Sequence, residues 1–461
     1  MSEQPKPRLP IVTTLARLAH GLQPEEIPEP AMQAARMCVL DYLGATLAGL
    51  GETPGAIVRS WVIDQRGESD SSVIGTFAKV PACNAALANG TSGHMVELDD
   101  VHGACIGHPG VVVVPAALAL AEKLHLSGLK FLSSVVAGYE IMARCGAYMG
   151  ISHYAIWHPT ATLGALGSAA ASVQAMDLDL VQAENAIAIA ATMASGLREV
   201  FVGGSNCKHI HPGLASRNGI IAAELASRGF TGPVTAIEGT MGFRRAHSGA
   251  GHEEGLEGLP GGKLHIQDTE VKVFASCRSA HTAAEAGILA KQEGVVPAAV
   301  KNITLEIPRA TAEDPAWGDL SPENPLAAKL SIPYNFVVSM VDGCCYLGQF
   351  TPDRVKDTVV RSLLSRTEIR SSEELERFYP EHVGTKATVR LNNGESVIKK
   401  VVIPIGHPKR PLDEAVVCSK FMELAVPVIG SNAGRLKQVV LGLDAVSTAN
   451  ELLELCALSR E

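Results

Sequence analysis

Aromatic residues are scarce in this chain of 461 residues. They make up 4% of the sequence, whereas hydrophobic residues of all kinds reach 46% and glycine contributes 44 residues. Most of the apolar content is therefore aliphatic, with much of it alanine, the residue that favours helices most. The composition indicates closely packed helices with small side chains. The length exceeds that of one ordinary core, which predicts two domains.

Long apolar runs are also missing. The longest candidates, residues 111–120 and 186–197, fall short of the roughly 18 to 20 apolar residues that a membrane-spanning helix needs. Residues 1–10 are polar and rich in proline, without the apolar centre of a secretory signal. We therefore expect no membrane association and a cytoplasmic location.

Excess positive charge and paired cysteines are absent as well. The 39 Lys and Arg residues are outnumbered by 48 Asp and Glu residues, and the net charge of −9 disfavours nucleic acid as a partner. The ten cysteines include no Cys-x-x-Cys pair, only the adjacent Cys344-Cys345, which indicates reduced and mostly buried thiols. An anionic substrate would then need a locally basic pocket.

The first half of the chain has the periodicity of helices and almost no strand pattern. Gly229 follows the last of these segments, in a position where helices often end. The segments expected to be helical are residues 31–51, 82–93, 110–124, 128–146, 161–176, 180–197 and 214–228.

The pattern changes near residue 260. Residues 267–274 alternate in polarity, a helix is expected at 281–294 and a strand at 303–308, and residues 327–343 return to helical spacing around Pro333. Asn393-Gly394, between strand-like residues 387–391 and 396–403, is typical of a tight hairpin turn. Helical spacing resumes from residue 409 to residue 458.

These patterns predict a mainly α protein with an α+β part. We expect a large all-helical domain that begins with residues 1–264 and an α+β domain at residues 265–404. Residues 405–461 are expected to return to the helical domain, which would then be built from both chain ends.

The first polar cluster is Glu97-Leu98-Asp99-Asp100-Val101-His102, followed by His108-Pro109-Gly110 and an apolar helix. A helix start offers N–H groups and a dipole that favour an anion. The structural alternative is that the acids cap local turns and the histidines are structural. A metal site is a further alternative, although His102 and His108 lack the His-x-x-x-His spacing of a helical ligand pair.

Two more clusters stand at predicted helix starts. His158 precedes the small-residue helix at 161–176, and Lys208-His209-Ile210-His211 precedes the helix at 214–228. An ammonium group beside switchable imidazoles suits carboxylate binding. The alternatives are a structural histidine and a solvated basic loop.

A fourth cluster extends from Lys272 to His281. Arg278 can bind a carboxylate with two parallel hydrogen bonds, and Lys272 or His281 can reach the same ligand. Cys277 is either a nucleophile or a small buried side chain. We favour the second, because carbon-acid chemistry needs no covalent thiol.

Taken together and in this order, the clusters resemble the MmgE/PrpD family of 2-methylcitrate dehydratases, cis-aconitate decarboxylases and iminodisuccinate epimerases. The resemblance covers nearly the whole chain. Its motifs are Leu40-Asp41-Tyr42-Leu43-Gly44, Glu97 to Asp100, His108-Pro109, His158-Pro159, Lys208 with Arg217-Asn218-Gly219, Lys272 to His281, Ser331-Ile332-Pro333-Tyr334 and Leu441-Gly442-Leu443-Asp444.

The resemblance implies a homodimer in which the α+β domain forms a lid over the helical domain, with the active site between them and no metal or organic cofactor. His108, His158, Lys208 and Lys272 match pocket residues of the family. The expected catalytic residues are His108, His158, Lys208 and Asp99, and the expected substrate-binding residues are Lys272, Arg278, His102, His281 and Tyr334.

The reactions of the family share one difficulty, which is the negative charge that develops on a carbon beside a carboxylate. One well-placed donor stabilises such charge by about 10² to 10³ in rate, a role for Lys208, Lys272 and Arg278. Proton transfer by a positioned histidine contributes roughly 10² to 10⁴ more. We expect His108 and His158 to serve as acid and base.

Four residues depart from the family pattern. Glu97-Leu98 replaces a frequent Asp-Phe, Gly110 stands where dehydratases tend to carry a polar residue, and Cys277 stands where animal cis-aconitate decarboxylases carry a histidine. Dehydration of 2-methylcitrate is the first expectation. Decarboxylation of cis-aconitate and epimerisation of iminodisuccinate are alternatives, and a catalytically silent carboxylate-binding protein and a metallohydrolase are alternatives of other classes.

Overall fold

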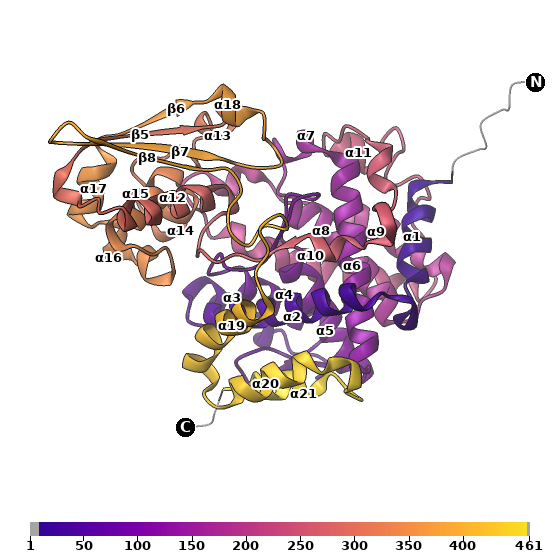
Figure 1. Ribbon diagram of the computed structural model, residues 1–461. Coiled ribbons are helices and arrows are strands. Elements are labelled where there is room, and N and C mark those ends of the chain that lie inside the picture. Colours follow the sequence, from indigo (N-terminus) through magenta and orange to yellow (C-terminus); the bar gives the residue numbers. More distant parts are fainter. Residues whose placement is uncertain (1–8, 459–461) are drawn as a thin grey trace, which may run out of the picture.

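The computed structural model describes residues 9–458 and consists of a larger helical part and a smaller α+β part (Figure 1). The expectation of a mainly α protein with an α+β part is confirmed. The longer helices that the first half of the chain contributes to the larger part are α1 (Ile11–Gly21), α2 (Glu29–Gly49), α3 (Thr53–Asp64), α4 (Ala82–Gly93), α5 (Gly110–Leu124), α6 (Gly128–Met149), α8 (Pro159–Ala175), α9 (Leu180–Met193) and α10 (Cys207–Ala226).

Small residues let the central helices approach closely. Helix α8 is buried along its whole length, and it crosses α6 where Gly167 faces Gly138. A Cβ added at either glycine would lie 2.9 Å from the other glycine's carbonyl oxygen, so no larger residue fits without a shift. The scarcity of aromatic residues thus has a structural reason, because this packing depends on small side chains.

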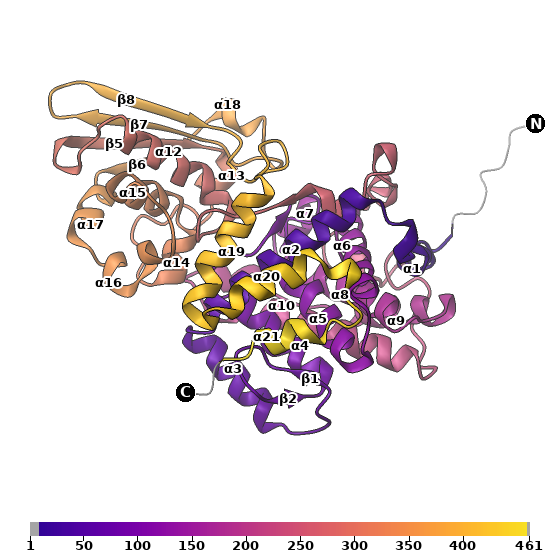
Figure 2. The ribbon, with the colours of Figure 1, turned by 60° about the horizontal axis from the view of Figure 1, so that its bottom comes forward.

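The last helices of the chain lie against the first part of the chain (Figure 2). Phe421 of α19 (Glu414–Ile429) is buried in one core with Tyr42 and Leu43 of α2, and it touches the position of Gly44. Lys420 Nζ donates to Asp41 Oδ1 at 2.6 Å. Helices α20 (Asn432–Leu441) and α21 (Asn450–Leu455) complete this layer. The helical core is therefore built from both ends of the chain, while the domain boundaries at residues 264 and 404 stay a prediction.

The α+β part, called the lid below, contains a four-stranded sheet in the order β6-β5-β7-β8. Strands β5 (Val300–Ile307) and β6 (Thr367–Ser371) are parallel, whereas β7 (Thr385–Leu391) is antiparallel to β5 and to β8 (Ser396–Val401). Helices α12 (His281–Gln292), α14 (Pro325–Leu330), α15 (Ile332–Asp342) and α17 (Thr358–Leu364) lie on one side of the sheet (Figure 1).

The predicted hairpin at Asn393-Gly394 is confirmed, with a longer connection than a two-residue turn. Residues 392–395 join β7 to β8, and Gly394 has the positive φ of 92° that favours glycine. The predicted helix at 327–343 is two helices, because Ser331 is extended before the proline-containing first turn of α15.

Two further segments differ from the sequence-based expectation. Helix α10 begins at Cys207, seven residues earlier than expected, so Lys208 and the two histidines after it lie on a helix and not in a loop before one. Of residues 267–274 only Thr269–Glu270 form a strand, β4, which pairs with β3 (Val101–His102) and so joins the lid to the helical part. Within residues 9–458, no helix combines the length and the apolar character that crossing a membrane requires.

Candidate active site

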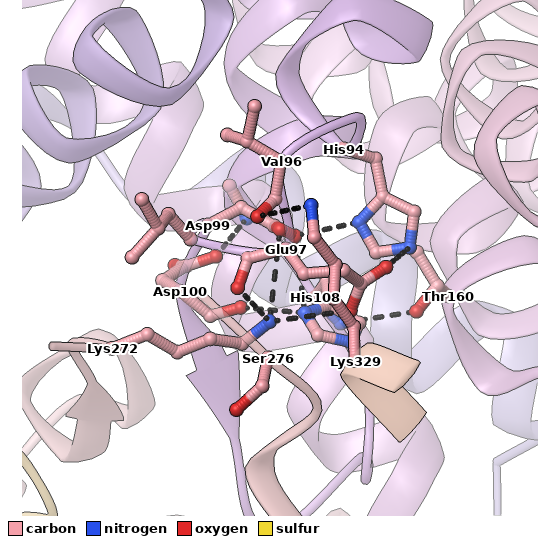
Figure 3. A network of polar contacts seen from close by, with 12 residues as sticks. His94, Val96, Glu97, Asp99, Asp100, His108, Thr160, Lys272, Ser276 and Lys329 are labelled. Atoms are coloured by element: carbon pink, nitrogen blue, oxygen red, sulfur yellow. Dashed lines mark hydrogen bonds and ion pairs between the residues drawn. The ribbon is translucent and has the colours of Figure 1, made fainter. Parts of the chain in front are cut away.

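The candidate site is formed where the segment after α4 meets Lys208 of α10 and the lid. Figure 3 shows this segment, from His94 to Asp100, beside Lys272 and Lys329 of the lid. His94 caps the end of α4, and the backbone then leaves the helix with Glu97 in the left-handed region at a φ of 57°. Four groups predicted from distant parts of the sequence converge on this segment: His108, His158, Lys208 and Lys272.

Glu97 lies between two buried lysines. Its carboxylate accepts a hydrogen bond from Lys208 and lies 3.7 Å from Lys272 Nζ, and all three side chains are at most 2% exposed. Burial alone disfavours the charged carboxylate, but Lys208, His94 and Lys272 outweigh it and hold the pKa of Glu97 well below its usual range. The two ammonium groups are therefore held in place before any ligand binds.

Asp99 bonds one histidine and lies close to a second. Its Oδ2 lies 2.8 Å from His94 Nδ1 and 3.1 Å from His108 Nδ1. Although burial opposes ionisation, His94, Lys272 and His108 hold the pKa of Asp99 well below its usual range. Lys272 is opposed by burial too, yet Asp99 and Glu97 raise its pKa above the ordinary value. This cluster therefore contains two carboxylates and two ammonium groups in contact.

The hydrogen bonds define which ring nitrogen of His108 is available. His108 Nδ1 lies 2.8 Å from the carbonyl oxygen of Asp100 and near Asp99, both acceptors, so Nδ1 carries the proton and Nε2 is the basic nitrogen. Burial lowers the pKa of His108 to about 4, against the opposing pull of Asp99. At neutral pH His108 is therefore a neutral ring able to accept a proton.

His158 stands beside this ring and is paired with a further histidine. Its ring centroid lies 6.4 Å from that of His108 and 6.1 Å from that of His94, and its Nδ1 lies 3.0 Å from His211 Nδ1. Burial above all, and then His211 and Lys208, lower the pKa of His158 well below its ordinary value. The substrate-free protein thus offers two neutral imidazoles, so an acid role for either requires negative charge brought by a ligand.

A cavity opens beside the cluster, between the helical part and the lid. His108 and Arg278 line it, together with Tyr154, Cys277 and Trp317. Arg278 Nη1 donates to Glu270 Oε1 at 2.9 Å, and this carboxylate, despite the cost of burial, raises the pKa of Arg278. Arg278 is consequently held in a fixed orientation at the wall of the cavity.

Three residues predicted to bind substrate do not join the cluster. His102 Nε2 lies 2.8 Å from the carbonyl oxygen of His265, in the β3–β4 connection. His281 Nε2 faces the carbonyl oxygen of Ser276 at 3.3 Å. Tyr334 is fully buried in the lid and donates to the carbonyl oxygen of Gln349 at 2.7 Å. Each of these three side chains forms a hydrogen bond with a backbone carbonyl oxygen. These bonds stabilise the fold and leave the three groups outside the cluster.

Sequence reasoning did not include three residues that the structure brings into the network: His94, Glu97 as a partner of both lysines, and Lys329. His94 lies three residues before Glu97. A histidine and an acid at this spacing, just after the end of a predicted helix, could have indicated that both belong to the site. Lys329 donates to the carbonyl oxygen of Val96 at 3.1 Å (Figure 3). No local sequence pattern places it there, because its position depends on how the lid docks.

Three imidazoles in the described residues have the proximity of metal ligands: His94, His108 and His158 each offer a nitrogen within 4.8 Å of the others. Both nitrogens of His94 are already engaged, since Nδ1 bonds Asp99 and Nε2 lies 2.7 Å from Lys208 Nζ. A cation bound by Nε2 would have to displace an ammonium group. The donors therefore fit a proton-transfer network better than a metal centre.

Comparison with known sequences agrees with the motifs named above. The MmgE/PrpD N-terminal domain matches residues 13–254, and the MmgE/PrpD C-terminal domain matches residues 274–445. The chain belongs to the MmgE/PrpD family. The first matched region lies within the helical part, and the second covers most of the lid together with α19 and α20 of the helical part.

Relatives in the MmgE/PrpD family align over most of their length. A cis-aconitate decarboxylase-like protein of Aspergillus oryzae is 29% identical, with 96% of this chain and 97% of the relative covered. A cis-aconitate decarboxylase of Aspergillus terreus is 26% identical, with 96% and 95% covered. The mouse cis-aconitate decarboxylase is 25% identical, with 89% and 86% covered. The chain is thus related over most of its length to lyases that act on a small carboxylic acid.

Proposed function

We propose that this protein is a lyase that needs no metal or organic cofactor and decarboxylates cis-aconitate or a closely similar small tricarboxylic acid. The observation that carries the proposal is the position of His108, whose basic nitrogen belongs to a ring lining a cavity that Arg278 also lines. The relatives named as cis-aconitate decarboxylases support this choice of substrate over 2-methylcitrate, which the motifs alone favoured.

Substrate binding uses Arg278 as the carboxylate clamp at the cavity wall. Its guanidinium group is oriented by Glu270 and keeps further N–H groups for a ligand, because one of its five donors accounts for the bond to Glu270. Lys208 and Lys272, fixed by Glu97 and Asp99, supply N–H donors that need no reorganisation when charge develops on the substrate.

The reaction breaks the bond between a carbon and one carboxylate group, and the electron pair remains on the carbon skeleton as carbon dioxide leaves. A proton must then be delivered to that skeleton. A bound polyanion raises the pKa of His108 and His158 from their depressed values, because nearby negative charge favours the imidazolium form. One of these rings protonates the carbon, and it then takes up a new proton from solvent when the next polyanion binds.

The test is incubation with cis-aconitate, 2-methylcitrate, citrate and iminodisuccinate in deuterium oxide, followed by NMR. We expect carbon dioxide release from cis-aconitate and one deuterium in the product at the protonated carbon. Conversion of 2-methylcitrate to an unsaturated acid without carbon dioxide release would replace the proposal by dehydration. Deuterium exchange into iminodisuccinate without bond cleavage would replace it by epimerisation.

Two alternatives of another class are separated by the same samples. A silent carboxylate-binding protein would perturb the ligand signals without forming product. A metallohydrolase would lose its activity on exhaustive chelation, whereas we expect turnover to survive chelation and metal analysis to find no stoichiometric ion.

The proposed assembly is a homodimer, which light scattering on the purified protein measures directly.

A further inference from the structure

Three lysine side chains bind three consecutive peptide carbonyls beside the candidate site. Lys329 Nζ donates to the oxygen of Val96 at 3.1 Å, Lys272 Nζ to that of Glu97 at 3.2 Å, and Lys420 Nζ to that of Leu98 at 2.6 Å. The segment that carries these carbonyls is neither helix nor strand, so the lysines take the place of a regular backbone partner.

The three lysines come from separate parts of the chain. Lys272 and Lys329 belong to the lid, and Lys420 belongs to α19 of the C-terminal layer, while the carbonyls follow the end of α4. All three side chains are buried. Positive groups at the carboxyl end of a helix are electrostatically favourable, but burying three ammonium groups at one turn has a large desolvation cost. Such a costly arrangement points to a role beyond stabilising the end of the helix.

Lys329 differs from the other two in lacking a carboxylate partner. Lys420 also bonds Asp41, and Lys272 lies 3.7 Å from both Glu97 and Asp99, whereas among residues 9–458 no carboxylate oxygen lies within 4 Å of Lys329 Nζ. The ring of Phe350 faces it at 5.9 Å. The bond to Val96 is therefore the one polar contact that the described structure gives this ammonium group.

We propose that Lys329 and Lys420, together with Lys272, form a clamp that positions the carboxylates of Glu97 and Asp99 for the reaction. Lys329 and Lys420 are positioning residues: they hold backbone carbonyls and act through the segment that carries the two acids. The effect on catalysis rests on the function proposed above, whereas the effect on the segment does not.

The segment after α4 has a backbone conformation that needs stabilising contacts. Glu97 has a φ of 57°, a backbone conformation that a residue other than glycine seldom adopts without support. Its carboxylate reaches Lys208, and two residues later Asp99 meets His94 and His108. A relaxed segment would displace both acids from their partners at once.

The clamp also has a pH dependence that can be measured. Burial lowers the pKa of Lys329 to about 8, and the charged groups that act on it are Glu97, Glu52, Lys272 and Lys208. The carbonyl of Val96 is held most strongly while Lys329 is charged, so the clamp loosens as the pH rises through about 8.

The first experiment is hydrogen exchange of peptides covering residues 94–102 in Lys329→Met, in the double variant Lys420→Met with Asp41→Asn, and in a control, Lys386→Met. Lys386 forms an ion pair within the lid sheet, with Glu306 at 2.8 Å. We expect exchange about tenfold faster in both clamp variants, confined to this segment, and unchanged exchange in the control. Protection equal to that of the unmodified protein in Lys329→Met would overturn the clamp.

The second experiment repeats the exchange measurement between pH 7 and pH 9.5, normalised to the unstructured peptide. The unmodified protein should lose protection at residues 94–102 as the pH rises, and Lys329→Met should show no such loss. This comparison also removes any contribution from Asp100, whose pKa burial raises to about 7, because the variant keeps that group. An equal pH response in both proteins would contradict the role of Lys329.

The third experiment measures turnover of cis-aconitate. Lys329→Met should lower kcat by at least about tenfold with little change in KM, because the acids are displaced while Arg278 remains. An unchanged kcat in that variant, beside an active control, would overturn the positioning role. If the unmodified protein turns over none of the tested acids, the proposed function is wrong, and the exchange results still decide the clamp.

Discussion

The contact between Glu97 and Lys208 allows a quantitative prediction by a double-mutant cycle. The variants are Glu97→Gln, Lys208→Met and the two combined, and the quantity compared is the free energy of unfolding in urea. Both side chains are at most 2% exposed, so water screens their attraction little. Two charges about 4 Å apart attract by about 4 kcal/mol at an effective dielectric constant of about 20.

Removing one partner is expected to be costly because the other charge stays buried. Glu97→Gln removes the negative charge that faces both Lys208 and Lys272. It should lower the free energy of unfolding by about 3 to 5 kcal/mol. Lys208→Met should cost about 3 kcal/mol, since Lys272 still compensates Glu97. The combined variant should be more stable than the sum predicts, with a coupling energy of about 2 to 3 kcal/mol.

The matched control is the ion pair between Lys386 and Glu306 on the lid sheet. Its Nζ–Oε2 distance is 2.8 Å, but the side chains are 32% and 28% exposed, so a coupling of at most about 1 kcal/mol is expected. Our reasoning is refuted if the Glu97–Lys208 coupling lies within about 0.5 kcal/mol of zero, or if it equals that of the control pair.

Three further results are expected. His158→Ala and Lys208→Ala should each lower turnover at least roughly 100-fold while circular dichroism stays unchanged, and near-normal rates in both would remove the site. The melting temperature should fall from pH 6.5 to pH 4.5, because unfolding lets buried histidines take up protons that the fold excludes; calorimetry showing a flat profile would contradict this. The histidines concerned, whose pKa burial lowers to about 4, are His102, His108, His153, His211 and His265. Phe421→Ala should cost about 3 to 5 kcal/mol in urea unfolding, and a loss below about 1 kcal/mol would contradict the packing of α19 on α2.

Several elements were predictable from local sequence because their causes are local. The bounds of α4 and α5 agree with the expected 82–93 and 110–124, since a proline, Pro81 or Pro109, directly precedes each helix and Gly93 ends the first. The lid hairpin follows from Asn393-Gly394. The predictions failed where helical spacing and proline point to different boundaries. Helix α10, which begins at Cys207, continues through Pro212, whereas the periodic run at 327–343 breaks at Ser331, two residues before Pro333.

The sequence by itself determined which residue types are present and where they occur along the chain, and the family motifs picked out His108, His158, Lys208 and Lys272. Only the tertiary structure decided how they are used. Burial makes the two imidazoles neutral, Glu97 and Asp99 hold the ammonium groups, and the carbonyl oxygen of Gln349 occupies Tyr334. The reason is physical: the charge and the hydrogen bonds of a side chain depend on its neighbours in space. Glu97 meets Lys208 and Lys272, 111 and 175 residues further along the chain, only when α10 and the lid pack against the segment after α4.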